Sequence, residues 1–235
     1  RATPGECLRA WWAESLIAPQ VFSLWQPFFW RRLPDTAVGE GTLAGQRAVV
    51  LVHGFVCNRG LWLPWLRELR ARGVPYATVN LEPVFGGIDD YAPQIEAAVA
   101  RATRATGQAP LVVAHSMGGL AVRAWLRAVG PGAESRVHHI VTIGSPHHGT
   151  WLGRLSRVPN GRQMSDMGEW VRALAASESP ALYRRFTCWY SSCDNIVFPT
   201  RTATLPGADN RLLRGRPHVA MAYDATVMRE SLARL

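Results

Sequence analysis

From residue 48 onward, short apolar runs alternate with longer stretches of helical periodicity, and this alternation constrains the fold more than any other feature. The runs VVLV at 49–52 and IVTI at 140–143 are continuous and rich in β-branched residues. Strands that are covered on both faces have this composition, because neither side of the strand meets water. Strands alternating with helices are typical of a mostly parallel sheet with helices on both faces. The sequence therefore predicts an α/β fold.

The expected elements form a single domain over residues 48–235, since a chain of 235 residues with 48% hydrophobic residues can build one substantial core. Strands are expected at 48–52, 76–80, 111–114, 137–143, 186–190 and 211–214. Helices are expected at 61–71, 91–106, 117–129 and 224–235.

An insertion at 150–185 interrupts this rhythm with a stretch rich in Pro, Gly and Arg, followed by a helical stripe. The apolar positions of the stripe are Met167, Trp170, Val171 and Leu174. Asp166 and Glu169 are placed as a capping pair at its start. The sequence predicts an amphipathic helix that lies over the sheet.

Residues 1–47 are expected to form an aromatic-rich extension on or beside the core. Its large aromatic residues are Trp11, Trp12, Phe22, Trp25, Phe28, Phe29 and Trp30, and they end at Arg31 and Arg32. Such a belt with basic flanks suits a lipid or membrane interface. The alternative is a pair of short helices packed on the domain's own core.

The formal net charge of +9 does not by itself indicate nucleic acid, because the 26 basic residues are all arginine and are scattered along helical stretches. We expect no nucleic-acid partner and a monomer. The chain starts at Arg1 without a methionine, which favours a processed or truncated product that is secreted, periplasmic or membrane-associated. The four cysteines match no zinc pattern, and their disulfide state is left open.

The segment PLVVAHSMGG places a serine between a predicted strand and a predicted helix. A sharp turn at this point holds the serine in strained backbone geometry, so that its Oγ projects from the sheet edge. The helix N-terminus behind it favours developing negative charge. Ala114 and Gly118 supply the small residues that the close chain passage requires, with alanine in place of the more usual glycine. Ser116 is therefore the predicted nucleophile.

A serine needs a base that is oriented by a carboxylate, and on this type of sheet the chain order is serine, acid, histidine. The downstream histidines are His138, His139, His147, His148 and His218. Of these, His218 follows the last predicted strand, where the base is required. Asp194 lies on the loop after the strand FTCWY and is the predicted acid. Asp209 and Asp224 are the alternatives, which we interpret as a turn residue and a helix cap.

The tetrahedral intermediate of such chemistry needs two backbone N–H donors. Met117, directly after the serine, supplies the first. The second is expected from Phe55, because Gly54 in the segment VLVHGF lets the chain turn at the end of the first core strand. His53 and His115 are interpreted as loop or packing residues.

Taken together, the segments HGF, AHSMGG, GSPHHGT, SSCDNIV and RPHVAMAYD resemble those of bacterial lipases and esterases of the α/β-hydrolase superfamily. The resemblance covers 48–235 and is strongest to small lipases whose elbow pentapeptide begins with Ala. It implies Ser116, Asp194 and His218 as the triad. A single residue follows His-Gly in place of a triple-glycine loop, and in this respect the sequence resembles the class of lipases that takes medium or long acyl chains. Residues 1–47 have no counterpart in the smallest of these lipases, and the insertion at 150–185 is longer.

The predicted function is therefore a serine carboxylester hydrolase that cleaves lipid-like esters through an acyl-enzyme. Phe55 and Trp170 are the predicted substrate-binding residues, with the insertion acting as a cap or lid; the alternative is a fixed helix that completes the core. No metal and no cofactor are expected. The competing functions are a polyester hydrolase, a thioesterase, or an inactive membrane-associated binding module.

Overall fold

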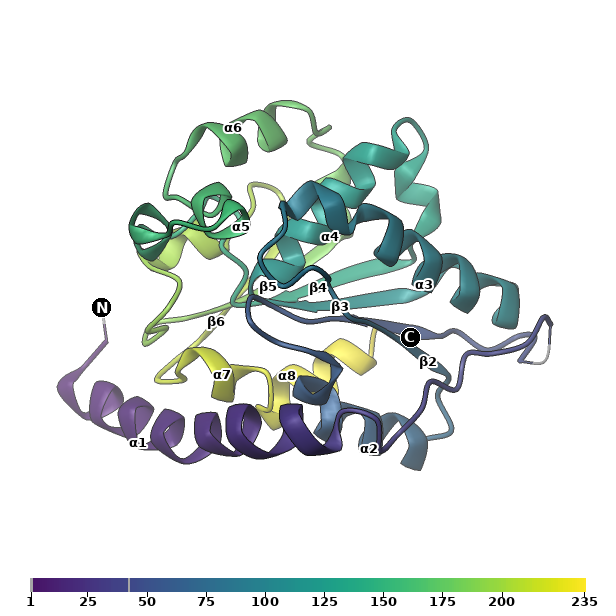
Figure 1. Ribbon diagram of the computed structural model, residues 1–235, viewed down its shortest axis with the longest axis horizontal. Helices are drawn as coiled ribbons and strands as arrows, with labels where there is room; N and C mark the ends of the chain where they lie inside the picture. Colours follow the sequence, from purple (N-terminus) through teal and green to yellow (C-terminus); the bar gives the residue numbers. More distant parts are fainter. Residues whose placement is uncertain (1, 42) are drawn as a thin grey trace.

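A parallel sheet forms the centre of the computed structural model, which describes residues 2–41 and 43–235 (Figure 1). Its strand order is β2-β1-β3-β4-β5-β6, and every neighbouring pair is parallel. The strands are β1 Val49–Val52, β2 Tyr76–Val79, β3 Leu111–His115, β4 His139–Ile143, β5 Phe186–Ser191 and β6 Asp209–Leu213. The predicted α/β class is confirmed.

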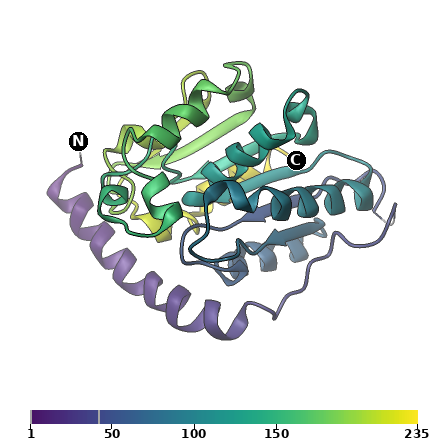
Figure 2. The same ribbon diagram turned by 45° about the horizontal axis from the view of Figure 1, so that its top comes forward.

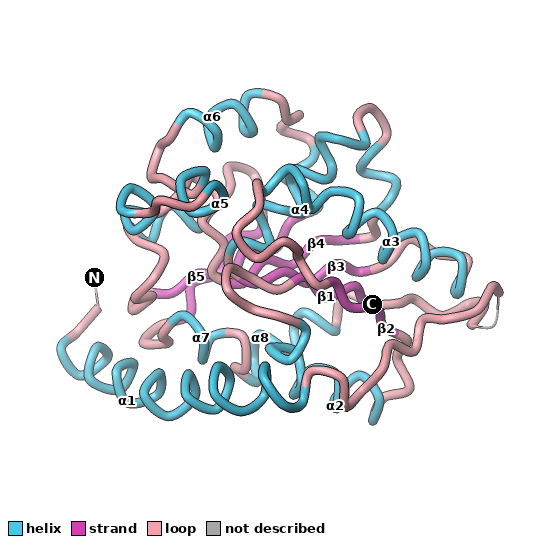
Figure 3. Tube along the Cα trace, viewed as in Figure 1, coloured by secondary structure: helices cyan, strands magenta, loops and turns pink. Residues whose placement is uncertain are grey.

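Helices cover both faces of the sheet, and Figure 3 shows the strands enclosed between them. The α-helices are α1 Pro4–Gln20, α2 Leu63–Ala71, α3 Ala92–Thr106, α4 Met117–Val129, α5 Pro159–Gln163, α6 Glu169–Ala176, α7 His218–Met221 and α8 Ala225–Leu232. The π-helix η1 spans Val21–Phe29, and short 3-10 turns join other elements.

Alternate residues of the strands point to opposite faces of the sheet and pack in two separate cores, and the strand sequences are therefore apolar throughout. Val50 and Val52 pack into the core beneath α3 and α4. Val49 and Leu51 pack into the opposite core with α2 and α8. Because all strands are parallel, their carboxyl ends lie at one edge of the sheet, and the loops that follow them start there.

Several predicted boundaries need correction. The strand predicted at 137–143 begins at His139, and the last strand begins at Asp209, which is therefore a strand residue and not a turn residue. Asp224 is confirmed as a helix cap, because its carboxylate accepts from the N–H groups of Thr226 and Val227. The helix at 117–129 is confirmed at both ends.

The N-terminal segment is a single long rod and not the pair of short helices considered from the sequence. Helix α1 runs directly into η1, and Figure 2 shows α1 along the outside of the molecule. A capping box between Thr3 and Glu6 fixes its start. The rod reaches the core through Val21, which is fully buried beside α2. Over residues 2–41 and 43–235, no helix combines the length and hydropathy needed to span a membrane.

The insertion folds as short helical turns over α4, but its predicted stripe is only partly correct. Met167 precedes α6, has a positive φ of 51° and is 55% exposed. Gly168 is the N-cap, with no side-chain cap, so the predicted Asp166 and Glu169 pair is wrong. Val171 and Leu174 are buried in the core. The helical periodicity therefore begins two residues later than predicted.

A buried ion pair fixes the end of the insertion to α4. The Arg123 guanidinium donates to the Glu178 carboxylate, with both side chains almost fully buried, and also to the His147 carbonyl at 2.8 Å. The Tyr183 hydroxyl donates to the same carboxylate at 2.8 Å. Because Arg123 lies on the helix that follows Ser116, this network connects the insertion with the helix behind the elbow.

We expect Glu178→Gln to lower the free energy of unfolding by about 3–5 kcal/mol, since it leaves a buried guanidinium without its counter-charge. Urea denaturation measures this difference. The exposed Glu134→Gln is the control and should change stability by less than about 0.5 kcal/mol. Equal stabilities of the two variants would show that the pair is not structurally important.

Candidate active site

Ser116 lies between β3 and α4 with φ 55° and ψ −131°, a conformation that residues with a Cβ rarely adopt. The close packing around it explains the small residues nearby. A Cβ on Gly118 would lie 2.5 Å from the His53 carbonyl oxygen, and one on Gly54 would lie 2.7 Å from the Ser116 Cβ. Ser116 is thereby held at the carboxyl edge of the sheet, at the start of α4.

Three side chains that lie far apart in the sequence form one hydrogen-bonded chain. Ser116 Oγ is 2.9 Å from His218 Nε2. His218 Nδ1 is 3.0 Å from both carboxylate oxygens of Asp194. Because a carboxylate only accepts, Nδ1 carries the proton and Nε2 is left to accept from the serine. The structure thus brings together the three residues predicted as a triad.

The loop after β5 holds the Asp194 carboxylate in a fixed orientation. Its Oδ1 accepts from the backbone N–H groups of Ile196 at 2.9 Å and Val197 at 2.8 Å. The rival acids are engaged elsewhere: Asp209 pairs with Arg211 and Arg234, and Asp224 caps α8. Geometry therefore favours Asp194 over both alternatives.

The backbone of His218 is held on three sides by side chains that the sequence analysis did not assign to the site. Its N–H donates to Asn195 Oδ1 at 3.0 Å, and its carbonyl accepts from His115 Nε2 at 3.2 Å. Glu14 of α1 accepts from the next N–H group, that of Val219, at 3.0 Å. The His115 and His218 rings also pack with centroids 4.7 Å apart. Only His115 had a sequence signal, its position beside the serine.

The charges around His218 make it a stronger base than an ordinary histidine. Burial lowers its pKa, but the charge and hydrogen bond of Asp194 and the charge of Glu14 outweigh burial and raise the pKa above 6.5. Burial lowers the pKa of His115 to about 3 and that of His53 to about 4, so both stay neutral near pH 7.

We therefore expect kcat/KM on a soluble ester to fall as the pH is lowered, with a midpoint above pH 6.5, which is the ordinary pKa of histidine. We call this part of the pH profile its acid limb. Only neutral His218 can accept the Ser116 proton, so a raised pKa means that activity is lost at a higher pH as the pH falls. His139→Asn, which changes a histidine at the opposite end of β4, should leave the limb unmoved. A midpoint below 6.5 would contradict this assignment of the base.

The loop after β1 is oriented by His53. Its Nε2 accepts from the Leu81 N–H at 3.0 Å, so Nδ1 bears the proton and donates to the Gly54 carbonyl at 2.9 Å. In a trans peptide the carbonyl and the following N–H point in opposite directions, so this bond also fixes the direction of the Phe55 N–H. Val56 follows with a positive φ of 53°. His53 thus sets the peptide whose N–H is the candidate oxyanion donor.

The predicted substrate contact of Trp170 is not supported by its surroundings. Its indole N–H donates to Asp89 at 2.8 Å, and the Arg127 guanidinium lies over its ring. Figure 1 places α6 on the opposite side of the sheet from α7, which carries His218. Periodicity identified the apolar face of this stretch without showing which neighbour covers it, and the substrate contact of Trp170 stays a prediction. Phe55 is half-buried, with its ring centroid 6.0 Å from that of Phe85.

All four cysteines are free thiols. Within the described ranges, 2–41 and 43–235, no group of three or more His, Cys, Asp or Glu side chains has a metal-binding arrangement.

The parallel sheet and the serine at its strand–helix turn define the fold of an α/β-hydrolase. The model of the alpha/beta hydrolase family matches residues 49–233, and the chain belongs to this family. Among curated proteins, none matches the chain in sequence.

Solved structures show the same fold at low sequence identity. The chain is similar to the mature form of a lipase from Bacillus licheniformis, with a TM-score of 0.70 and 16% identity over 86% of this chain and 94% of that chain. A monoacylglycerol lipase from Paleococcus ferrophilus has a TM-score of 0.56 and 12% identity over 81% of this chain and 97% of that chain. A metagenomic carboxyl esterase has a TM-score of 0.56 and 16% identity over 84% of this chain and 76% of that chain. The chain is thus related in fold to lipases and esterases.

Proposed function

We propose that this protein is a serine carboxylester hydrolase that cleaves lipid-like esters, with Ser116 as nucleophile, His218 as base and Asp194 as the acid. The observation that carries the proposal is the hydrogen-bonded chain from Ser116 Oγ through the His218 ring to the Asp194 carboxylate. The fold alone would not carry it, since one fold hosts many functions.

In the proposed reaction, Ser116 Oγ attacks the ester carbonyl carbon while its proton moves to His218 Nε2. The resulting oxyanion would accept from the N–H groups of Met117 and Phe55. Collapse of the intermediate breaks the ester C–O bond, and His218 gives its proton to the departing alcohol. A water molecule, deprotonated by His218, then attacks the acyl-enzyme. As the bond between the acyl carbon and Ser116 Oγ breaks, His218 returns the proton to Oγ and the carboxylic acid is released.

The exposed residues at the carboxyl edge of the sheet favour an apolar substrate. Large hydrophobic side chains stand on the loops after β1, β2, β4 and β5, all of which start at this edge: Val56, Val84, Phe85, Trp151, Leu155, Met167 and Ile196. Exposed apolar groups gathered around one edge mark a binding surface. An ester with an apolar acyl chain suits them better than a charged substrate does.

The contacts of α6 favour a fixed cap over a mobile lid. Val171 and Leu174 are buried, and Trp170 is bound to Asp89, so turning the helix outward would expose core residues. Activity on a triglyceride emulsion should therefore saturate smoothly, and Trp170→Ser should not change the shape of the curve. A jump in rate at the solubility limit that Trp170→Ser removes would establish a lid instead.

The proposal is tested with a fluorophosphonate probe and a series of nitrophenyl esters of increasing acyl length. The probe should label wild type and not Ser116→Ala, and kcat/KM should rise from acetyl toward medium chains. Absence of labelling would mean an inactive scaffold. Labelling with faster cleavage of acyl thioesters than of matched esters would favour a thioesterase.

A further inference from the structure

We propose that the outer face of the N-terminal rod, α1 and η1, docks on the surface of an anionic lipid membrane. This inference goes beyond the proposed activity and does not depend on it. Helix α1 carries apolar residues on two opposite faces, and only one of these faces contacts the rest of the molecule.

The inner face of α1 is occupied by the domain. Positions 6, 10, 14, 17 and 21 recur at helical spacing and point inward: Ala10 and Val21 are buried, and Ile17 packs against the core that contains α2. Glu14 reaches the backbone of α7. These contacts fix how the rod is rotated against the domain.

The outer face carries large hydrophobic side chains that have no cover. Six of them along the rod are at least 42% exposed: Leu8, Trp12, Leu16, Phe22, Leu24 and Phe28. In α1 they follow the spacing i, i+4, i+8 from Leu8, on the side opposite to Ala10 and Ile17. A continuous apolar face of this kind on a helix that is already docked indicates a second apolar surface.

Charge identifies that surface as anionic. The carboxylates of residues 2–34 are Glu6 and Glu14, and both turn inward, to the helix cap and to α7. The arginines of the same stretch, Arg9, Arg31 and Arg32, are all exposed. Tryptophan with arginine is the combination that membrane–water interfaces favour, because the rings suit the headgroup region and the arginines attract anionic lipid.

The test is co-sedimentation of the full chain with vesicles of phosphatidylcholine alone or mixed with phosphatidylglycerol. Wild type should sediment with the mixed vesicles, and Trp12→Ser/Leu16→Ser should lose most of this binding. Arg31→Gln/Arg32→Gln should weaken it by about fivefold per arginine at low salt. The control, Leu235→Ser, removes an exposed leucine that follows α8, outside the rod and outside the apolar edge of the sheet, and should bind like wild type.

Three outcomes would overturn the proposal. The first is that wild type fails to sediment with either vesicle, and the second is that the control loses as much binding as Trp12→Ser/Leu16→Ser. The third is a concentration-dependent dimer, seen by light scattering and abolished by Trp12→Ser/Leu16→Ser, without vesicle binding. That result would assign the face to a second copy of the chain.

A second observation carries an independent inference, which rests on the proposed function: Glu14 is a positioning residue for His218. Its two carboxylate oxygens accept from the Val219 N–H at 3.0 and 3.2 Å, and one of them also accepts from the Ala220 N–H at 3.2 Å. These are the residues directly after His218 in α7.

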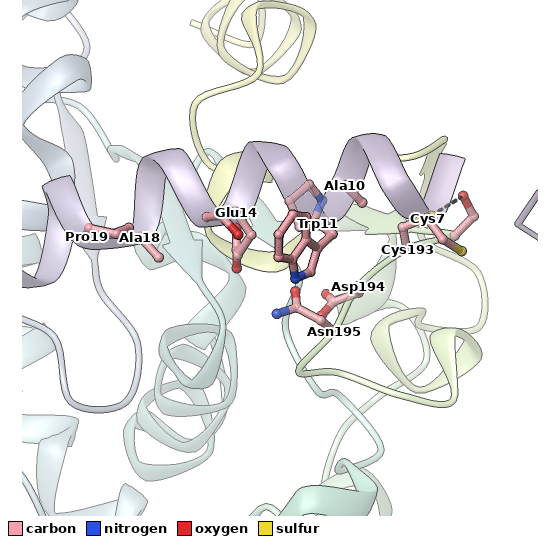
Figure 4. A pocket seen from close by; sticks show the side chains of 12 residues that line it. Cys7, Ala10, Trp11, Glu14, Ala18, Pro19, Cys193, Asp194 and Asn195 are labelled. Carbon is pink, nitrogen blue, oxygen red and sulfur yellow. Dashed lines mark hydrogen bonds between the residues drawn. The ribbon is translucent and has the colours of Figure 1, made fainter. Parts of the chain in front are cut away.

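The side chain reaches this position from across the molecule. Figure 4 shows Glu14 on the side of α1 that faces the loop of Asp194 and Asn195. Helix and loop together line a groove of about 680 Å³, in which Trp11 also lies. The N-terminal rod therefore contacts both the segment of the base and the loop of the acid.

The role of Glu14 divides into a hydrogen-bonding part and a charge part, and two variants separate them. Glu14→Ala removes both and should lower kcat on a soluble ester by roughly tenfold or more with little change in KM, since a misplacement of about 1 Å can cost about 100-fold. Glu14→Gln keeps an acceptor oxygen and should keep most of kcat, but it should move the acid limb of the pH profile to lower pH. Glu40→Gln, an exposed carboxylate outside the rod, is the control.

Wild-type kcat and pH profile in both variants would overturn this role. So would an equal loss of kcat in both variants with an unmoved acid limb, which would indicate a purely structural contact. The rate of labelling by a fluorophosphonate is measured in parallel. If wild type itself is not labelled, the proposed function fails, and that failure is distinct from these outcomes.

Discussion

Replacing Ser116 with alanine is expected to lower turnover of a nitrophenyl ester by about 10⁶-fold, because the other triad residues do little without the nucleophile. The fold should survive, since alanine removes one oxygen from a side chain whose own hydrogen bond is to His218. The measurement is kcat for wild type and variant, with thermal unfolding to show that both are folded. Relief of the positive-φ strain is not expected, because alanine also has a Cβ.

The matched control changes a serine that is buried close to the elbow. Ser145 is fully buried, and its Oγ has no hydrogen-bond partner. It packs against Gly119 of α4, the helix that starts directly after Ser116. Ser145→Ala should retain activity within a few-fold of wild type. Activity of Ser116→Ala close to that of Ser145→Ala would rule out Ser116 as the nucleophile.

Asp194→Asn is expected to lower kcat by about 10⁴-fold, because an amide at this position no longer enforces the His218 tautomer with its proton on Nδ1. His218→Ala should lose at least as much, since it removes the proposed base itself. Kinetics on a soluble ester at constant pH check both changes.

Two aspartates that the structure places elsewhere serve as controls. Asp209→Asn changes a strand residue paired with Arg211, and Asp224→Asn changes a helix cap. Both should lose little kcat, and Asp224→Asn should lower stability by about 0.5–2 kcal/mol. A greater loss of kcat in Asp209→Asn than in Asp194→Asn would move the acid to β6.

The residues of the site were accessible to sequence reasoning because parallel strands end at the same edge of the sheet. Once β3 and β5 are recognised from their apolar runs, Ser116 and Asp194 must both lie at that edge, and His218 follows the last strand. The chemistry therefore follows from residue types in a fixed order. Their distances of 2.9 and 3.0 Å could not be predicted, because they depend on how the loops fold.

The supporting contacts had no local signal. Glu14 and Val219 are 205 residues apart, and nothing near Glu14 distinguishes it from a solvent-exposed glutamate. The hydrogen bond between the Trp170 indole and Asp89, 81 residues apart, likewise had no signal in the sequence. Side chains that act over long sequence separations are placed by packing, not by periodicity.

The sequence by itself determined the α/β class, the family and the types and order of the residues at the carboxyl edge, because these follow from short-range patterns of hydropathy and turn chemistry. Only the tertiary structure decided which face of α1 lies inward, that α6 is held by the core, and that His115, Asn195 and Glu14 surround the segment of His218. Helix α1 carries apolar residues on both sides, so its pattern is compatible with either orientation. The orientation of α1 is set by contacts with segments far away in the sequence, and the energies of such contacts cannot be read from a local stretch of sequence.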